Sequence, residues 1–227
     1  RTIMFYEKEV GFYRDIATSS PLGTPQCFAA FHDAESDDFV LVLEDLTGGE
    51  VYSQIDGCPI PQAKYAVKAM ADHHAAFWDS SRFSEDLAWV PRGWDPPMPQ
   101  GVQQGVADAW PICQEMFGDR ISERIRKVCE RFPEVTTELM QYPDVGTTLA
   151  HGDFRLDNLF FNGPDLTVID WQICIRTRGA YDLGYFLSQS LTVEDRRAHE
   201  KSLIDLYQST LALSGIDYPT DELMTDY

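Results

Sequence analysis

Two short apolar runs on either side of a four-residue turn constrain the fold of this 227-residue chain more than any other feature. The runs cover 159–161 and 166–169, and between them stands Asn162-Gly163-Pro164-Asp165, which is typical of the turn of a β-hairpin. Asn158 directly precedes the first run and Asp170 directly follows the second. Because the strands of a hairpin are antiparallel, the pattern predicts that Asn158 and Asp170 lie at the same end of it.

A carboxylate lies on the loop before this hairpin, since Asp153 precedes Asn158 by five residues. Phosphoryl transfer needs such a set: Mg²⁺ takes carboxylate and amide oxygens and holds the nucleotide phosphates, while a separate aspartate orients the acceptor hydroxyl or accepts its proton. The spacing predicts Asp153 as the catalytic base, with Asn158 and Asp170 as the metal ligands. The alternative is that all three residues only cap turns.

The charge balance and the cysteine pattern exclude several classes of protein. Lys and Arg number 18 against 37 Asp and Glu, a net charge of −19 that disfavours binding to nucleic acid or to an anionic membrane surface. The five cysteines are widely spaced and form no C-x-x-C motif, as expected of reduced thiols. No apolar run approaches the roughly 20 residues that span a bilayer. We therefore expect a cytoplasmic protein without nucleic-acid or membrane partners.

The rest of the chain is expected to be largely helical. Strands are expected at 27–32 and 39–43 as a hairpin with its second strand well buried, followed by a polar linker at 44–49. The four prolines of 89–99 predict an irregular loop. Helices are expected at 3–17, 61–78, 101–117, 119–132 and 133–142, from a cap at Thr192 towards Gly215, and from about 219 onward.

The motif His151-Gly152-Asp153 with Asn158, followed by Ile169-Asp170-Trp171, resembles the catalytic signature of the aminoglycoside phosphotransferase and choline kinase group. The amino-acid sequence of residues 169–172 and 181–187 is most similar to that of the ecdysteroid kinase-like branch, and the resemblance covers nearly the whole chain. It implies an α+β, protein-kinase-like fold of two lobes. Residues 1–46 would be the remnant of the N-terminal nucleotide-binding lobe and hinge, and 47–227 the helical C-terminal catalytic and acceptor-binding lobe.

The resemblance also implies an activity and a nucleotide site. The activity is transfer of the γ-phosphoryl of ATP, with Mg²⁺, to a hydroxyl of a small molecule. Glu9 would pair with the ATP-binding lysine, and the main chain of Glu44 and Leu46 would bind adenine. The alternative for Glu9 is that it belongs to a solvated face of the helix. The alternative for the whole protein is a non-catalytic module with the same fold that binds a nucleotide or senses a ligand.

Other residues take supporting roles by the same resemblance. Asp182 would hold the catalytic loop from the following helix or cap that helix, and His151 and His74 are interpreted as buried structural histidines rather than acid–base groups. Arg155 would neutralise charge on the transferred group, or else pair with Asp157 at the surface.

The N-terminal part of the sequence departs from the family's pattern, because neither a Gly-rich loop nor a strand with a lysine precedes the first expected helix. The resemblance therefore implies that the chain is truncated at the N-terminus. The acceptor stays open: the aromatic residues of the expected acceptor region, Trp89, Trp94, Trp110 and Tyr142, favour a bulky apolar alcohol, whereas the acidic net charge favours a cation. The oligomeric state also stays open.

Overall fold

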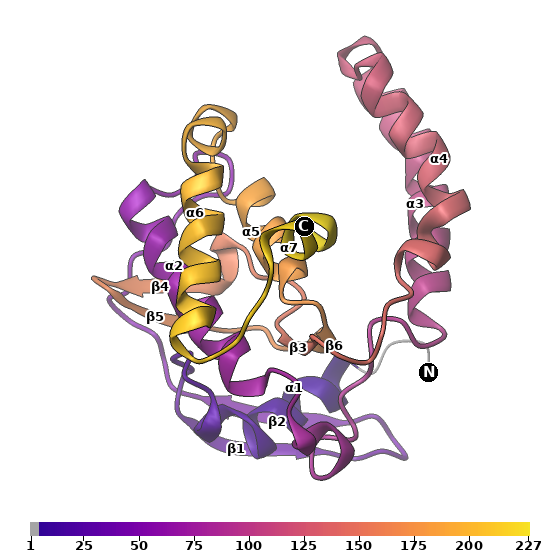
Figure 1. Ribbon diagram of the computed structural model, residues 1–227. Helices are drawn as coiled ribbons and strands as arrows, with labels where there is room; N and C mark the ends of the chain where they lie inside the picture. The colour runs from indigo at the N-terminus through magenta and orange to yellow at the C-terminus, as the bar shows by residue number, and fades with distance from the viewer. Residues whose placement is uncertain (1–4) are drawn as a thin grey trace. The chain divides into compact units, whose positions relative to one another are not determined.

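The computed structural model describes residues 5–227, and it is a mixed structure of helices and short antiparallel strand pairs (Figure 1). The expected α+β class is confirmed. The strands are β1 (Cys27–His32), β2 (Phe39–Leu43), β3 (Thr148–Ala150), β4 (Leu159–Asn162), β5 (Asp165–Val168) and β6 (Ile175–Thr177). The helices are α1 (Phe5–Asp15), α2 (Ile60–Phe77), α3 (Met98–Phe117), α4 (Glu123–Leu139), α5 (Ala180–Gln189), α6 (Val193–Leu213) and α7 (Thr220–Asp226).

The chain divides into two compact units. Of the described residues, one unit contains 5–90 and Val145–Tyr227, and the other contains Pro91–Asp144. The first unit includes residues on both sides of position 46, so the expected lobe boundary there stays a prediction. All six strands and the catalytic-loop sequence belong to the first unit.

The first unit begins with α1 packed on the hairpin of β1 and β2. The two strands pair as expected, but the prediction that the second strand is well buried is wrong. Leu41 and Leu43 are partly buried, whereas Val40 and Val42 are 52% and 45% exposed. Successive strand residues point to opposite faces, and α1 covers only one face of this two-stranded sheet.

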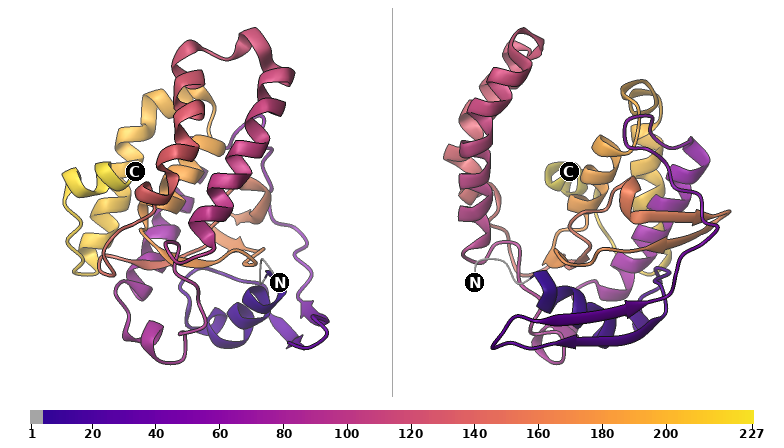
Figure 2. Two further views of the ribbon diagram at one scale, coloured as in Figure 1. Left: turned by 90° about the vertical axis from the view of Figure 1, so that its right-hand side faces the viewer. Right: turned by 180° about the vertical axis from the view of Figure 1, so that it is seen from behind.

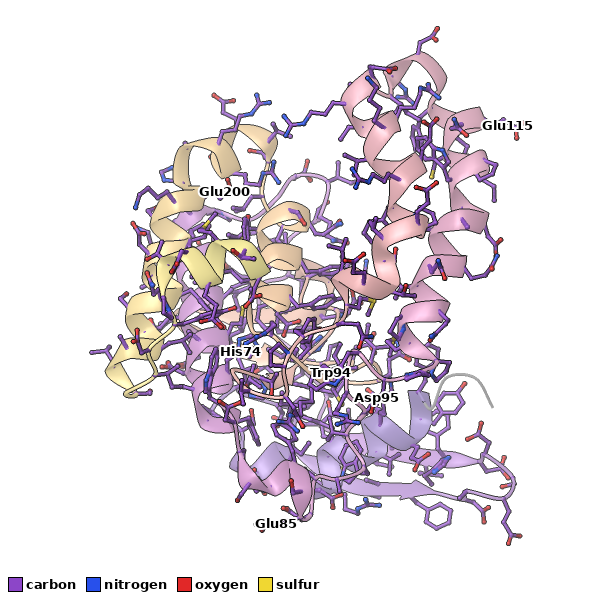
Figure 3. All side chains as sticks on the ribbon, turned by 45° about the vertical axis from the view of Figure 1, so that its right-hand side comes forward. His74, Glu85, Trp94, Asp95, Glu115 and Glu200 are labelled. Atoms are coloured by element: carbon purple, nitrogen blue, oxygen red, sulfur yellow. The ribbon has the colours of Figure 1, made fainter. Side chains whose placement is uncertain are left out.

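The core of the first unit lies among three helices, with α2 packed against both α5 and α6 (Figures 1 and 2). The sequence signals for α6 and α7 are confirmed at their starts. Thr192 caps α6 by accepting a hydrogen bond from the Asp195 amide, and Pro219 directly precedes α7. His74, near the end of α2, is completely buried (Figure 3).

The hairpin of β4 and β5 forms as the sequence predicts, with Asn162 paired to Asp165 across Gly163-Pro164. Gly163 has a φ of +63°, which suits glycine in a tight turn. The Val168 amide donates to the Gly23 carbonyl, and Glu50 and Phe161 exchange two main-chain hydrogen bonds, so two further segments pair with the hairpin edges. The segment before Glu50, which contains the expected hinge, is thereby anchored beside β4.

The second unit consists of the loop before α3 and two helices that pack on each other, α3 and α4. The prediction of separate helices at 119–132 and 133–142 is wrong. A 3₁₀ turn occupies Gly118–Arg120, Ser122 caps α4, and the helix continues through Pro133 to Leu139. Pro133 lacks an amide hydrogen, but its carbonyl accepts a bond from the Gln103 side chain on α3, so packing between the helices supports the turn that the proline weakens.

Candidate active site

The catalytic-loop sequence follows β3, and Gly152 determines its path. Gly152 has a φ of +88°, and a Cβ atom there would lie 2.5 Å from the carbonyl oxygen of Ile173. Only glycine fits both the backbone conformation and the space. The turn places Asp153 at the end of the loop, before a 3₁₀ turn at Leu156–Asn158 leads into β4.

Three side chains hold the carboxylate of Asp153. The Tyr185 hydroxyl donates to Oδ1 at 2.7 Å, while Arg155 Nε and Asn158 Nδ2 donate to Oδ2 at 3.0 and 3.2 Å. The side chain of Asp153 is 17% exposed, so it is partly shielded but still reachable. A carboxylate held by three donors from separate positions has a fixed orientation, which general-base chemistry requires.

Asn158 is oriented by the loop that it closes. Its Nδ2 donates to the main-chain oxygen of Asp153 at 2.9 Å as well as to the carboxylate, so Oδ1 is its remaining side-chain acceptor. The Asn158 carbonyl accepts from the Ile169 amide at 3.1 Å, so Asn158 and Asp170 lie at one end of the hairpin, as the sequence predicts. Asp170 has a φ of +66°, a conformation that is uncommon for a residue with a side chain.

Glu9 reaches this end of the hairpin from α1. Burial, and next the charge of Asp170, raise the pKa of Glu9 to about 7, against the lowering effect of a hydrogen bond from the Trp171 main chain. The Trp171 ring stacks on Phe12 of α1 with centroids 3.7 Å apart. Aromatic packing thus fixes the helix that carries Glu9 against the segment that carries Asp170.

Asp182 supports the catalytic loop from α5. Its Oδ2 accepts from the His151 amide at 2.7 Å and its Oδ1 from the Gly152 amide at 2.9 Å, while His74 Nε2 lies 3.3 Å from Oδ2. Burial alone would raise the pKa of Asp182, but its hydrogen bonds, first that with His74, and its electrostatic interactions with His74 and His151 outweigh burial, and the pKa is lowered. Asp182 therefore stays ionised inside the core, where its partners satisfy it.

Both ring nitrogens of His151 form hydrogen bonds with main-chain groups. Its Nδ1 accepts from the Asp153 amide at 3.1 Å, which requires the proton on Nε2, and Nε2 donates to the Ile169 carbonyl at 2.9 Å. Burial lowers its pKa, so the ring is neutral near pH 7. It connects the loop of Asp153 to the strand end before Asp170.

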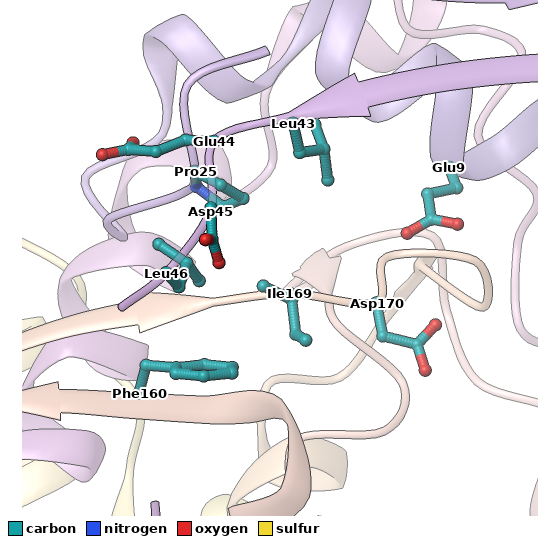
Figure 4. Close-up of a pocket in the computed structure, with 9 residues that line it drawn as sticks. All are labelled: Glu9, Pro25, Leu43, Glu44, Asp45, Leu46, Phe160, Ile169 and Asp170. Carbon is teal, nitrogen blue, oxygen red and sulfur yellow. The ribbon is translucent and has the colours of Figure 1, made fainter. Parts of the chain in front are cut away.

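A pocket of about 610 Å³ opens beside the hairpin (Figure 4). Its lining comes from α1, the segment before β1, the end of β2 with the segment after it, and the β4–β5 hairpin with the two residues after it: Glu9, Pro25, Leu43, Glu44, Asp45, Leu46, Phe160, Ile169 and Asp170. Apolar side chains line one part of it, and Glu9 and Asp170 lie together at the other (Figure 4). The Glu44 amide already donates to the Gln26 carbonyl at 2.8 Å, so the Glu44 carbonyl and the Leu46 amide are the main-chain groups to consider for a base.

Arg155 makes the pair with Asp157 that the sequence offered as one alternative, and it also contacts Asp153 and Gln54. Besides its bond to Asp153, its Nη1 lies 3.2 Å from Asp157 Oδ2 and donates to Gln54 Oε1 at 3.0 Å. Its side chain is 35% exposed. Gln54 comes from the segment after Glu50, so a residue distant in sequence helps to orient Arg155.

The oxygens at the hairpin end suit a hard divalent cation. Asn158 Oδ1 and the Asp170 carboxylate are the ligand types that Mg²⁺ takes, and the charge of Asp170 raises the pKa of Glu9, so the two acidic groups act on each other. Within residues 5–227 no group of three or more His, Cys, Asp or Glu side chains could hold a metal. Few protein ligands are typical for Mg²⁺, which keeps several waters and binds substrate phosphates.

Sequence reasoning missed Tyr185 and Gln54. Tyr185 stands three residues after Asp182 on α5, so helical spacing places both on one face and could have indicated it. Gln54 has no local signal.

Of the aromatic residues expected near an acceptor, Trp89 packs against the core of the first unit beside Gly11, while Trp94 packs on Tyr142 within the second unit, with ring centroids 5.1 Å apart.

Solved structures of antibiotic kinases share this fold. The amicoumacin kinase hAmiN, in complex with AMP-PNP, Ca²⁺ and Ami, matches with a TM-score of 0.61 at 11% identity, over 97% of this chain and 67% of that one. The GDP and kanamycin complex of APH(2")-IIia matches with 0.58 at 15% identity, over 98% and 70%. The macrolide 2'-phosphotransferase MphH from Brachybacterium faecium matches with a TM-score of 0.53 at 13% identity, over 97% of this chain and 67% of that one. The fold is therefore that of the kinase-like small-molecule phosphotransferases.

Residues 97–215 match the sequence model of the ecdysteroid kinase-like family, which is more than half of the chain. The chain belongs to the ecdysteroid kinase-like family. No curated protein matches it in sequence.

Proposed function

We propose that the protein transfers the γ-phosphoryl of ATP to a hydroxyl of a small molecule. The observation that carries this proposal is the convergence of Asp153, Asn158 and Asp170 at one end of the β4–β5 hairpin, beside the pocket. Family membership and the shared fold support the reaction class. Asp153, Asn158 and Asp170 are the residue types and spacing that phosphoryl transfer uses.

The pocket suits a nucleotide in one orientation. Adenine would lie among Leu43, Leu46 and Phe160, with the main chain of Glu44 and Leu46 as hydrogen-bonding groups. The phosphates would then extend towards Asp170, which with Asn158 Oδ1 would hold Mg²⁺. When bound, Mg²⁺ neutralises charge on the phosphate oxygens.

Asp153 would receive the acceptor's proton. As the acceptor oxygen forms its bond to the γ-phosphorus, the bond from that phosphorus to the bridging oxygen of ADP breaks, and the hydroxyl proton passes to the Asp153 carboxylate. Arg155, beside Asp153, would face the negative charge of the transferred group. The role of Glu9 as partner of an ATP-binding lysine is part of the same proposal.

The proposal also covers the residues around the catalytic loop and the kind of acceptor. His151 and Asp182 would act as structural support, since their hydrogen bonds hold the loop rather than face the pocket. The acceptor would be a small hydroxylated compound. Among residues 5–227 no helix is both long and apolar enough to cross a membrane.

The test uses the full-length protein with γ-labelled ATP and Mg²⁺, against aminoglycosides, choline-like amines, sugars and sterol-like alcohols. Label transferred to one class, and reduced by a factor of ~10² or more in Asp153→Asn, supports the proposal. Nucleotide binding is measured separately. A protein that binds Mg-ATP and transfers nothing to any acceptor or to water contradicts the enzymatic proposal and favours a non-catalytic nucleotide-binding module.

A further inference from the structure

The two carboxylate oxygens of Asp153 accept different numbers of hydrogen bonds. Each carboxylate oxygen offers about two acceptor positions. Oδ2 takes two donors, Arg155 Nε at 3.0 Å and Asn158 Nδ2 at 3.2 Å, whereas Oδ1 takes one, the Tyr185 hydroxyl at 2.7 Å. Among the described residues, the position left for a further donor is therefore on Oδ1, next to Tyr185.

The bond from Tyr185 is the shortest of the three and comes from the helix that also supports the loop. Asp182, one turn earlier on α5, holds the amides of His151 and Gly152, so α5 fixes both the main chain and the carboxylate of the loop. The Tyr185 ring lies parallel to that of Tyr181, with centroids 6.3 Å apart and an interplanar angle of 11°. The hydroxyl is thus presented from a packed side chain.

The Tyr185 hydroxyl is a donor at every pH at which the enzyme would work. Burial, and then the hydrogen bond to Asp153, raise the pKa of Tyr185 to about 12. The torsion that turns a carboxylate about its Cβ–Cγ bond is soft, so an Asp153 without this donor could rotate. Arg155 and Asn158 both donate to Oδ2, so within residues 5–227 the Tyr185 hydroxyl is the donor that holds Oδ1.

We propose that Tyr185 is a positioning residue, which fixes Oδ1 of Asp153 so that its remaining acceptor position faces the hydroxyl of the acceptor. The inference rests on the proposed function. It adds that the acceptor hydroxyl binds Oδ1 rather than Oδ2, on the Tyr185 side of the carboxylate.

The test compares Tyr185→Phe with Tyr227→Phe in the full-length protein. Tyr227 also donates to a carboxylate at 2.7 Å, that of Glu200, and its ring also lies beside α5 at Gly184, so the control removes an equivalent bond away from Asp153. We expect kcat of Tyr185→Phe to fall roughly tenfold, because Asp153 loses one hydrogen bond to its charged carboxylate. KM for ATP and the melting temperature should be unchanged. Tyr227→Phe should keep the wild-type kcat.

A double-mutant cycle separates positioning from a general structural role. In an Asp153→Asn background, Tyr185→Phe should lower the residual rate less than twofold, because the carboxylate that it orients is gone. An equal loss in both backgrounds, or a wild-type kcat in the single variant, overturns the inference alone. A wild-type protein that neither binds nucleotide nor transfers phosphoryl overturns the proposed function, and the inference with it.

Discussion

The amide of Gly152 donates a hydrogen bond of 2.9 Å to Oδ1 of Asp182, a carboxylate that is 1% exposed. The bond joins α5 to the turn that presents Asp153, across thirty residues of sequence. The same carboxylate also accepts from the His151 amide and faces His74 on α2. One buried charge therefore connects the catalytic loop to two helices of the core.

Removing this charge should destabilise the first unit. Asp182→Ala leaves two buried amides and His74 without their acceptor, which should cost about 3–5 kcal/mol of unfolding free energy. Urea denaturation measures this cost. Asp205→Ala is the control, because Asp205 forms an exposed pair with Lys201 on α6 and should contribute less than about 1 kcal/mol. Equal losses in the two variants would contradict the supporting role of Asp182.

Gly152→Ala should cost more than Gly163→Ala, although both glycines have positive φ. At Gly163 no atom lies within 4 Å of an added Cβ, so only the backbone penalty of about 1–2 kcal/mol remains. At Gly152 the Cβ also meets the Ile173 carbonyl at 2.5 Å, which should add about 1–3 kcal/mol. The measurement is the difference in unfolding free energy between the variants, and a difference near zero would show that the loop moves freely.

The β4–β5 hairpin and the meeting of Asn158 with Asp170 follow from local sequence, because turn residues and apolar runs are short-range signals. The pairing of β3 with β6 was not predicted, since three-residue strands give almost no periodicity. The break expected at Pro133 was wrong because packing on α3 outweighs the local effect of proline. The contact of Gln54 with the site depends on long-range packing, which local patterns do not encode, whereas helical spacing after Asp182 could have indicated Tyr185.

Acid should destabilise the protein through His73. Burial, and next the neighbouring charge of His74, lower the pKa of His73 from 6.5 to about 3, and its Nδ1 lies 2.9 Å from the Ser20 hydroxyl. Between these pKa values the unfolded chain binds a proton that the folded chain does not, so stability is present above pH 6.5 and is lost as the pH falls towards 3.

Equilibrium denaturation at several pH values tests this dependence. One proton corresponds to a slope of about 1.4 kcal/mol per pH unit within the window. His73→Gln should reduce the wild-type slope by up to that amount, while His199→Gln, a partly exposed histidine on α6, controls for the loss of one imidazole. An unchanged slope in His73→Gln would mean that other groups cause the acid sensitivity.

Asp170→Asn should remove the effect of Mg²⁺ on nucleotide binding. In the wild type, ADP with Mg²⁺ at a hundredfold excess over Kd should raise the melting temperature by about 5–10 °C, and chelating Mg²⁺ should remove much of this shift. The variant keeps the size of the side chain and, as asparagine, tolerates the positive φ of 66°, but it loses the charge that attracts the cation. Its melting temperature with ADP should therefore be the same with and without Mg²⁺.

Asp165→Asn is the matched control for this experiment. Asp165 is the exposed first residue of β5, beside the turn at the opposite end of the same hairpin, so its charge is removed without touching the site. It should retain the full Mg²⁺ effect, which would assign the effect to the position of Asp170 rather than to the overall charge of −19. If Asp170→Asn also retains the effect, Asp170 is not a metal ligand, and the cation must be held by the nucleotide phosphates with other oxygens of the chain.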